Sequence, residues 1–257
     1  MKSMKSFFSK KSILGTMAVA AVCMLGTGNA QAQEFTIQGD LVSSYVWRGI
    51  YQGGAASFQP TLGFSVGNFS LTAWGSTSLS ESNKEIDLTA AYKFGEAGPT
   101  LSVASLWWNG QADVANGELT NDYFHFKSGD TGHHFEAGLA YTLPVEKFPL
   151  SIAWYTMFAG ADRKTTDKGE EKQAYSSYVE LNYPFSVKGV DLNATCGVVP
   201  YETPQYNVNG FAVTNLALKA TKAINFNDKF SLPIFVQAIW NPRLEDAHLV
   251  FGVTLRP

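Results

Sequence analysis

The chain has 257 residues, of which 45% are hydrophobic and 16% are charged, with 19 basic and 22 acidic side chains. If the four lysines of an N-terminal signal are removed, 15 basic residues remain against 22 acidic ones, a balance of −7. This acidic excess argues against nucleic acid as a partner, because a phosphate backbone is bound by a basic surface.

Residues 1–32 have the pattern of a cleaved signal peptide. Lys2, Lys5, Lys10 and Lys11 precede an apolar stretch over 13–25, and Ala30-Gln31-Ala32 places small residues where signal peptidase cleaves. We therefore expect an exported protein whose mature domain covers 33–257. The mature region has no run of 18 apolar residues, so a helical membrane span is not expected.

From Glu34 onward, apolar residues recur at every second position in runs that turn or loop residues separate. The expected strands cover 34–48, 59–67, 69–79, 85–94, 99–108, 133–143, 149–158, 173–185, 190–198, 211–223, 229–240 and 246–256. Several have the roughly 9–11 residues that a tilted strand needs to cross a bilayer. The pattern predicts an all-β fold, namely a transmembrane antiparallel up-and-down β-barrel of about twelve strands.

The lengths of the connections agree with this topology. Connections after the even strands are short, whereas those after the odd strands tend to be longer, with 109–132 the longest. Outer-membrane barrels alternate short periplasmic turns with longer external loops. An even number of strands would also bring the last strand beside the first, which closes the sheet and removes its edges.

Aromatic residues gather at both ends of the expected strands, as in the two interfacial girdles of membrane barrels. The set beside the short turns is Phe69, Phe94, Phe148, Phe185, Phe226 and Phe230. The opposite set is Tyr45, Trp47, Trp107, Trp154, Phe158, Tyr175 and Trp240. The alternative is a soluble lipocalin-like barrel, but that needs only about eight strands, and its outer face would not be apolar.

Charged residues of the expected strands alternate with the apolar ones, so they face the interior. The predicted pore-lining residues are Asp40, Arg48, Trp74, Glu85, Asp87, Lys93, Trp108, Glu136, Tyr178, Glu180, Asp191, Lys219 and Arg256. Six acids against four bases predict at most a mild cation preference. The aromatic members either stack on solutes or fill a narrow barrel. Arg48 either selects solutes or braces the wall through an ion pair with a lumen acid.

The most distinctive local segment is Ser44–Gln52, with the sequence Ser-Tyr-Val-Trp-Arg-Gly-Ile-Tyr-Gln, followed by Gln59-Pro60. We expect Tyr45 and Trp47 to face lipid at the outer rim and Arg48 to face the lumen. Together with Ala73-Trp74-Gly75-Ser76, this segment resembles the N-terminal part of TorF-type porins, a family of bacterial outer-membrane proteins. The resemblance implies passive transport of small solutes.

Two other groups of residues allow chemical interpretations. His248 on the last strand would approach Asp40 and Ser44 on the first, which raises the hypothesis of a hydrolase, but no nucleophile elbow is present. His133-His134, together with Asp122 and Asp130, lack the spacing of known zinc or calcium sites. We therefore expect no enzyme, metal or cofactor. The long loop 109–132 is the expected place for a constriction.

The sequence thus predicts a porin-like channel for passive diffusion of small polar solutes in a bacterial outer membrane. Its expected partners are outer-membrane lipid and lipopolysaccharide, the solutes themselves and the barrel assembly machinery. The oligomeric state stays open. The alternatives are a non-conducting structural or surface-recognition barrel and, less favoured, an outer-membrane hydrolase.

Overall fold

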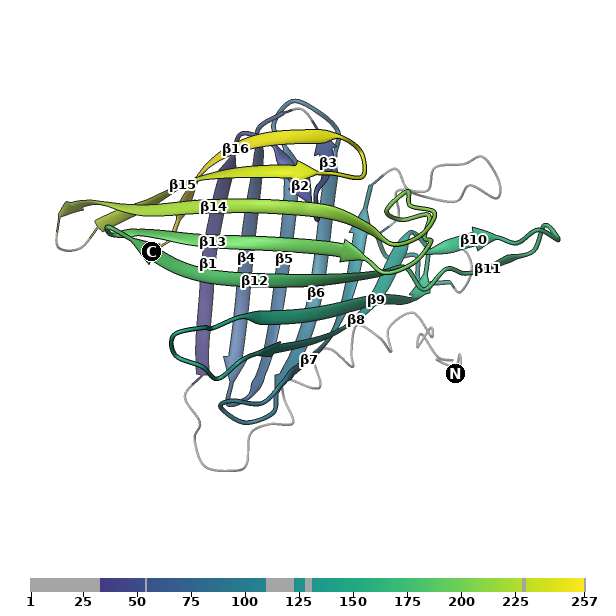
Figure 1. The fold of residues 1–257 in the computed structure, drawn as a ribbon, viewed down its shortest axis with the longest axis horizontal. Helices are drawn as coiled ribbons and strands as arrows, with labels where there is room; N and C mark the ends of the chain where they lie inside the picture. The colour runs from purple at the N-terminus through teal and green to yellow at the C-terminus, as the bar shows by residue number, and fades with distance from the viewer. Residues whose placement is uncertain (1–32, 54, 110–122, 128–130, 228–229, 257) are drawn as a thin grey trace, which may run out of the picture. The chain divides into compact units, whose positions relative to one another are not determined.

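The computed structural model describes residues 33–53, 55–109, 123–127, 131–227 and 230–256, which form a closed antiparallel barrel (Figure 1). Its strands are β1 (Gln33–Val42), β4 (Ser57–Val66), β5 (Phe69–Ser78), β6 (Lys84–Lys93), β7 (Thr100–Trp108), β8 (His133–Thr142), β9 (Ser151–Gly160), β12 (Ser177–Val187), β13 (Val190–Val199), β14 (Ala212–Asn227), β15 (Phe230–Asn241) and β16 (Asp246–Leu255). Each strand pairs with the next barrel strand along the chain, and β16 pairs with β1. The predicted all-β, twelve-stranded up-and-down barrel is therefore confirmed.

None of the described residues forms a helix long and apolar enough to cross a membrane. The predicted signal peptide, residues 1–32, lies outside the described residues. The expected strands other than the first agree with the observed ones to within four residues at each end. The strand expected at 173–185 begins at Ser177, because the preceding residues form a separate hairpin, β10 (Arg163–Thr165) with β11 (Glu171–Gln173).

The first expected strand, 34–48, is too long. β1 ends at Val42, the chain bends at Ser43 and Ser44, and residues 45–53 form a small hairpin of β2 (Tyr45–Trp47) and β3 (Ile50–Gly53). Trp47 pairs with Ile50, so the loop between these strands has only two residues, Arg48 and Gly49. Their φ angles of 49° and 83° are those of a type I′ turn, whose twist matches that of the flanking strands.

Gly49 is required at this turn for two reasons. Its φ angle is positive, and a Cβ atom there would lie 1.9 Å from the carbonyl oxygen of Thr214 on β14. Its own carbonyl oxygen accepts a hydrogen bond from Asn241 Nδ2 on β15 at 3.0 Å. The tip of the hairpin therefore lies directly against the inside of the β14–β15 wall.

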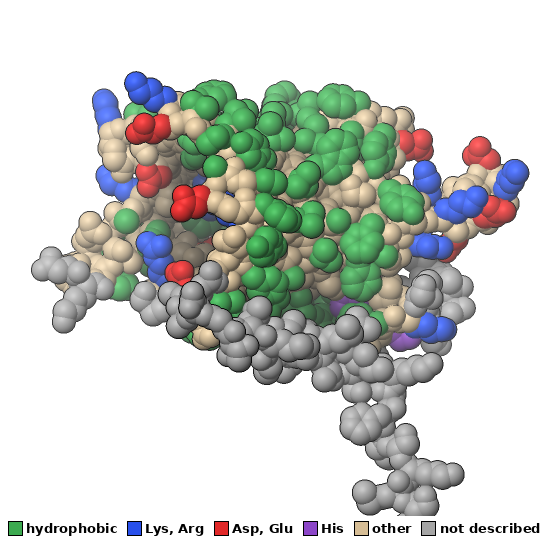
Figure 2. All heavy atoms as spheres, turned by 90° about the horizontal axis from the view of Figure 1, so that it is seen from below, with side chains coloured by type: hydrophobic (Ala, Val, Ile, Leu, Met, Phe, Trp, Pro, Cys, Tyr) green, Lys and Arg blue, Asp and Glu red, His purple; other side chains and the backbone are tan. Residues whose placement is uncertain are grey.

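The outer face of the barrel is apolar because side chains alternate across each strand. On β6, the side chains of Ile86, Leu88 and Tyr92 are exposed. Glu85, which directly precedes Ile86, is buried. Among the described residues, exposed apolar side chains of this kind occur on every barrel strand except β5 and β13. Figure 2 shows such a band across one face of the barrel, with Lys, Arg, Asp and Glu gathered beyond its two edges.

The barrel closes through the strand pair with the fewest paired residues. β1 pairs with β16 over only four residue pairs, from Gly39–Leu255 to Val42–Gly252, whereas β1 pairs with β4 over its full length. In Figure 1 the nearer wall, β12–β16, runs at a large angle to the farther wall formed by β1 and β4–β7. The expected pairing of the last strand with the first is confirmed.

The predicted aromatic girdles are partly present. Five of the six phenylalanines beside the short turns are exposed, as are Trp154, Phe158, Tyr175 and Trp240 at the opposite ends. The placement of Tyr45 and Trp47 at the lipid face is wrong, since the hairpin carries both into the barrel. Trp107 does face outward by register, but Tyr123 packs edge-on against it and it is buried.

Candidate functional site

The β2–β3 hairpin fills the barrel near the ends that carry the long loops. Val46 packs against a cluster from β1 and β14–β16: Val42, Ala217, Phe235, Ile239 and Val250. Ile50 packs on a second cluster that includes Tyr178, Val199 and Ala212. Trp47 contacts that cluster and a third one from β7 and β9, formed by Ala104, Leu106, Trp108 and Met157. One short hairpin thus contacts several parts of the surrounding wall.

The loop between β13 and β14, residues 200–211, enters the same space. Its Tyr206 and Val208 are buried, and the ring of Tyr206 stacks on Trp47 with a centroid distance of 5.5 Å and an interplanar angle of 6°. Trp47 also contacts Trp108 edge-on at 5.3 Å, and Tyr206 also stacks on Tyr178. We call the hairpin 45–53 together with Tyr206 the plug.

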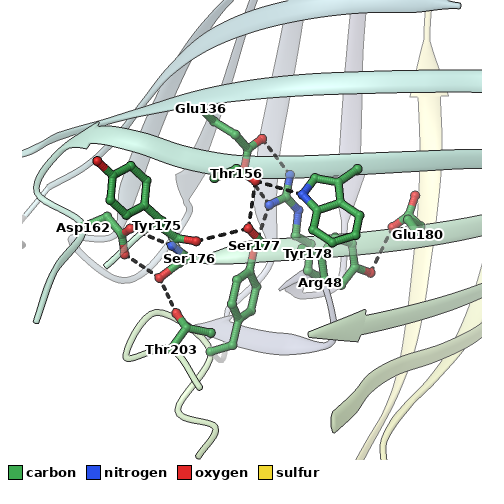
Figure 3. A network of polar contacts seen from close by, with 12 residues as sticks. Arg48, Glu136, Thr156, Asp162, Tyr175, Ser176, Ser177, Tyr178, Glu180 and Thr203 are labelled. Atoms are coloured by element: carbon green, nitrogen blue, oxygen red, sulfur yellow. Dashed lines mark hydrogen bonds and ion pairs between the residues drawn. The ribbon is translucent and has the colours of Figure 1, made fainter. Parts of the chain in front are cut away.

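Arg48 is the central polar residue of the plug (Figure 3). Its guanidinium donates two hydrogen bonds to the carboxylate of Glu136 on β8, at 2.7 and 2.8 Å, and one to the hydroxyl of Tyr206 at 2.7 Å. It also lies over the rings of Trp47, Tyr155 and Tyr178, each within 5 Å of the ring centroid.

This ion pair is well shielded from solvent, since the side chains of Arg48 and Glu136 are 13% and 5% exposed. Two parallel N–H···O bonds hold the guanidinium in a fixed plane, which a single point contact would not do. Removing one partner of such a pair costs about 3–5 kcal/mol, because the other charge stays buried. The arrangement corresponds to the bracing role considered for Arg48.

Burial raises the pKa of the Tyr206 phenol, and the Arg48 guanidinium opposes that effect. The phenol therefore stays neutral at physiological pH and accepts the hydrogen bond from Arg48. Sequence analysis did not single out Tyr206. The usable signal was the presence of Tyr201, Tyr206 and Val208 in a loop whose other residues are mostly polar.

A second polar network anchors the 200–211 loop (Figure 3). The buried Asp162 carboxylate accepts hydrogen bonds from the Ser176 backbone N–H at 2.8 Å and from Gln173 Nε2 at 3.1 Å. Ser176 Oγ bonds both Asp162 and Thr203, which lies in the loop. Because Thr203 pairs with Val208 through backbone hydrogen bonds, this network holds the segment that carries Tyr206.

The rest of the interior is polar. Glu180 on β12 accepts hydrogen bonds from the Tyr178 hydroxyl and from Asn182 Nδ2. Asn182 in turn accepts hydrogen bonds from Asn193 and Thr195 on β13. Lys219 on β14 lies 3.8 Å from the centroid of the Phe235 ring. The half-buried members of this set, Glu180, Asn182, Asn193 and Thr195, form a hydrogen-bonded lining instead of an apolar core.

The strand registers place the predicted pore-lining residues of the barrel strands on one face. Glu85 lies opposite Trp108 and Asp87 opposite Trp74, for example. They differ in burial. Glu85, Trp108, Glu136 and Tyr178 are buried; Asp40, Arg48, Trp74, Asp87, Glu180 and Lys219 are half-buried; Lys93, Asp191 and Arg256 are exposed. Of this set, Arg48, Glu136 and Tyr178 meet at the plug.

The hydrolase arrangement does not form. His248 Nε2 lies 3.0 Å from the Asp246 carboxylate, and the imidazole stacks on Tyr51 of the hairpin at 5.0 Å. Asp40 instead accepts a hydrogen bond from Gln38, and its partner on β16 is Thr254. The pairing between β1 and β16 stops before it reaches the position of His248, so Asp40 and Ser44 are not its partners.

The two adjacent histidines face opposite sides of β8, as the alternation requires. His133 contacts the Ser105 hydroxyl and the Tyr123 carbonyl, whereas His134 packs edge-on against Trp108 inside the barrel. The described residues contain no group of three or more His, Cys, Asp or Glu that could hold a metal ion. Asp122, Asp130 and most of the loop 109–132, the expected constriction, lie outside the described residues.

No family model and no curated protein matches the chain. Solved structures with a similar arrangement include an outer membrane channel from Pseudomonas putida F1, at 10% identity over 88% of this chain and 97% of that chain, with a TM-score of 0.41. Another is the translocator domain of the autotransporter NalP from Neisseria meningitidis, at 12% identity over 95% and 94% of the chains, with a TM-score of 0.38. A bacterial polysaccharide outer membrane secretin is 11% identical over 88% and 99%, with a TM-score of 0.37.

Proposed function

We propose that this protein is a bacterial outer-membrane channel that lets small polar solutes diffuse passively and that the plug restricts its bore. The observation that carries the proposal is the combination of a closed barrel, an apolar outer face and a polar interior beside the plug. A soluble barrel of this kind would expose its apolar band to water, where it would promote aggregation. In a bilayer the same band faces lipid, which is its natural solvent.

The distribution of charge supports the membrane location. The inward charges of β6, Glu85 and Asp87, alternate with outward Ile86 and Leu88. A Lys or Arg on the lipid face near mid-membrane would cost about 2–4 kcal/mol. Lipid, lipopolysaccharide and the barrel assembly machinery are the partners that this location implies, and export through the signal peptide 1–32 is part of the proposal. The resemblance of the segment Ser44–Gln52 to TorF-type porins agrees with this proposal.

The plug favours one alternative, a non-conducting barrel that acts through its external loops. Trp47, Arg48 and Tyr206 close much of the bore with contacts of the kind found in a protein core. We prefer a channel of low conductance, because the half-buried lining that includes Asn182, Asn193 and Thr195 can bind water beside the plug. An enzymatic role is not proposed.

Single-channel recording of the refolded protein in a planar bilayer tests this function. We expect small discrete steps for the wild type with a mild cation preference. Trp47→Ala should raise the conductance at least about twofold, because the indole joins the plug to two walls of the barrel. A mobility shift on heating should first show that each variant is folded.

Trp154→Ala is the matched control, since Trp154 is an exposed indole on the outer face of β9. It removes the same side chain without changing the bore, so its conductance should equal that of the wild type. A folded wild-type barrel without steps, together with a folded Trp47→Ala variant without steps, would reject the channel in favour of the non-conducting barrel.

A further inference from the structure

A cavity of about 130 Å³ lies between the β2–β3 hairpin and the wall formed by β4–β7. Its lining includes Tyr45 from the hairpin, Ser57 and Ser76 from β4 and β5, Glu85 from β6 and Trp108 from β7. The cavity is similar in size to an engineered protein cavity of about 150 Å³ that binds benzene. It therefore has room for a small organic molecule, and its lining is more polar than that of the benzene site.

Glu85 is the residue that the plug and the proposed channel leave unexplained. It is 2% exposed and lines the cavity. Within the described part of the chain neither of its carboxylate oxygens has a hydrogen-bond partner at bonding distance and angle, although Tyr45, Trp108 and Asp87 lie close enough to interact with it. The same holds for Oδ1 of Asp87, the next inward residue on β6, again counting described residues only. A buried carboxylate without a donor or a cation is costly, so such a group calls for a partner.

The basic side chains nearby are not positioned as that partner. Arg48 is already held by Glu136 and Tyr206. Lys84 also lines the cavity, but the ion pairs among the described residues do not include one between Lys84 and Glu85. Neither cation is therefore paired with Glu85, whose carboxyl group lines the cavity.

Aromatic rings flank the two carboxyl groups. Trp108 lies opposite Glu85 across the β6–β7 pair, and Trp74 lies opposite Asp87 across the β5–β6 pair. Tyr45 packs against Trp74 with a centroid distance of 5.6 Å. A cation near an aromatic face gains about 0.5–2 kcal/mol, and the hydrocarbon part of an amine gains from contact with the same rings. Carboxylates with aromatic walls favour an organic cation over an anion.

We propose that this cavity binds a small organic cation, with its ammonium group on Glu85 and its apolar body against Trp108 and Tyr45. The inference deepens the proposed function, because it names a class of solute. The claim that this cation passes through the barrel rests on the proposed function. The claim that it binds in the cavity does not, because binding does not require conduction.

Isothermal titration calorimetry on the folded full-length mature barrel in detergent micelles tests the site, with three probes of matched shape. Cyclohexylammonium, cyclohexanol and cyclohexanecarboxylate carry charges of +1, 0 and −1 on the same ring. We expect saturable binding of cyclohexylammonium only. Glu85→Gln keeps the size of the side chain and removes the charge, and it should weaken this binding at least tenfold.

Asp191→Asn is the control variant, because Asp191 is an inward but exposed carboxylate on β13, outside the cavity. Its affinity should equal that of the wild type, which excludes a general attraction to an acidic lumen. Equal binding of cyclohexanol, or unchanged affinity in folded Glu85→Gln, would overturn the proposal. Absence of binding by all three probes would also overturn it. Conductance is measured separately, so either claim can fail alone.

Discussion

The barrel has two interiors that differ in almost every physical respect. Around the plug, side chains such as Met157, Tyr178 and Val199 are fully buried, and Arg48 makes a desolvated ion pair. Away from the plug, the inward side chains are half-buried or exposed and bond one another, as Asn182, Asn193 and Thr195 do. The same alternation of apolar and polar residues builds both regions.

The difference follows from the number of strands. About eight strands enclose a space that wall side chains can fill by themselves, whereas a wider barrel leaves a lumen. In this protein the chain supplies a filler where packing is dense, namely a hairpin with Val46, Trp47 and Ile50 directed at different walls. Where no filler is present, the wall is lined by groups that can bind water.

The largest loss of stability is expected when the ion pair of the packed region is broken. Arg48→Met leaves the Glu136 carboxylate buried without its cation, so it should lower the free energy of unfolding by about 3–5 kcal/mol. Urea-induced unfolding from lipid vesicles, followed by tryptophan fluorescence, measures this value.

The double variant Arg48→Met with Glu136→Met is the control for that measurement. It removes both charges, so it should recover most of the loss, since well-packed apolar residues often replace a buried ion pair without cost. If the single and double variants were equally destabilised, the loss would come from packing of the Arg48 stem and not from the unpaired charge.

A smaller effect is expected where a glycine packs against Tyr178, which in turn stacks on Tyr206 of the plug. A Cβ atom on Gly197 of β13 would lie 2.0 Å from the Tyr178 hydroxyl and under 3 Å from its ring. Gly197→Ala should therefore cost about 1–3 kcal/mol through overpacking, in the same unfolding assay. Gly210→Ala is the matched control, because its Cβ would meet no atom within 4 Å; an equal cost in both variants would contradict a packed interior at Tyr178.

The smallest effect is expected in the polar region. Asn182→Ala removes hydrogen bonds to Glu180, Asn193 and Thr195, but these side chains are half-buried. Solvent can replace the lost partners, so the cost should be about 0.5–1.5 kcal/mol. A loss as large as that of Arg48→Met would show that this region is as dry as the plug, and the contrast between the two interiors would fail.

Much of the fold could be predicted from local sequence, because strand alternation records which face each residue occupies. It gave the twelve barrel strands, the pairing of the last strand with the first and the inward direction of Arg48. It failed at residues 45–47, where the alternation of β1 continues without a break although the chain has turned into a new hairpin. Arg48-Gly49 is also a less familiar type I′ sequence than Asn-Gly.

The contents of the site were harder to predict, because they depend on residues far apart in the chain. Nothing near Arg48 indicates Glu136 or Tyr206 as its partners, and Asp162 acts on the plug only through Ser176 and Thr203. The cavity beside Glu85 is enclosed only when the hairpin lies against the β4–β7 wall. Alternation predicts which face of a strand a side chain occupies. It does not predict which residues from distant strands meet inside the closed barrel.

The hairpin also sets an order of events for folding. Its bonds join residues 88 positions apart at Arg48–Glu136 and 192 apart at Gly49–Asn241, so their loop-closure entropy is met late. Asn241 is the last residue of β15, and only β16 and its four-residue seam follow it. The hairpin follows β1 near the start of the barrel, yet it reaches its final contacts only after β15 is in place.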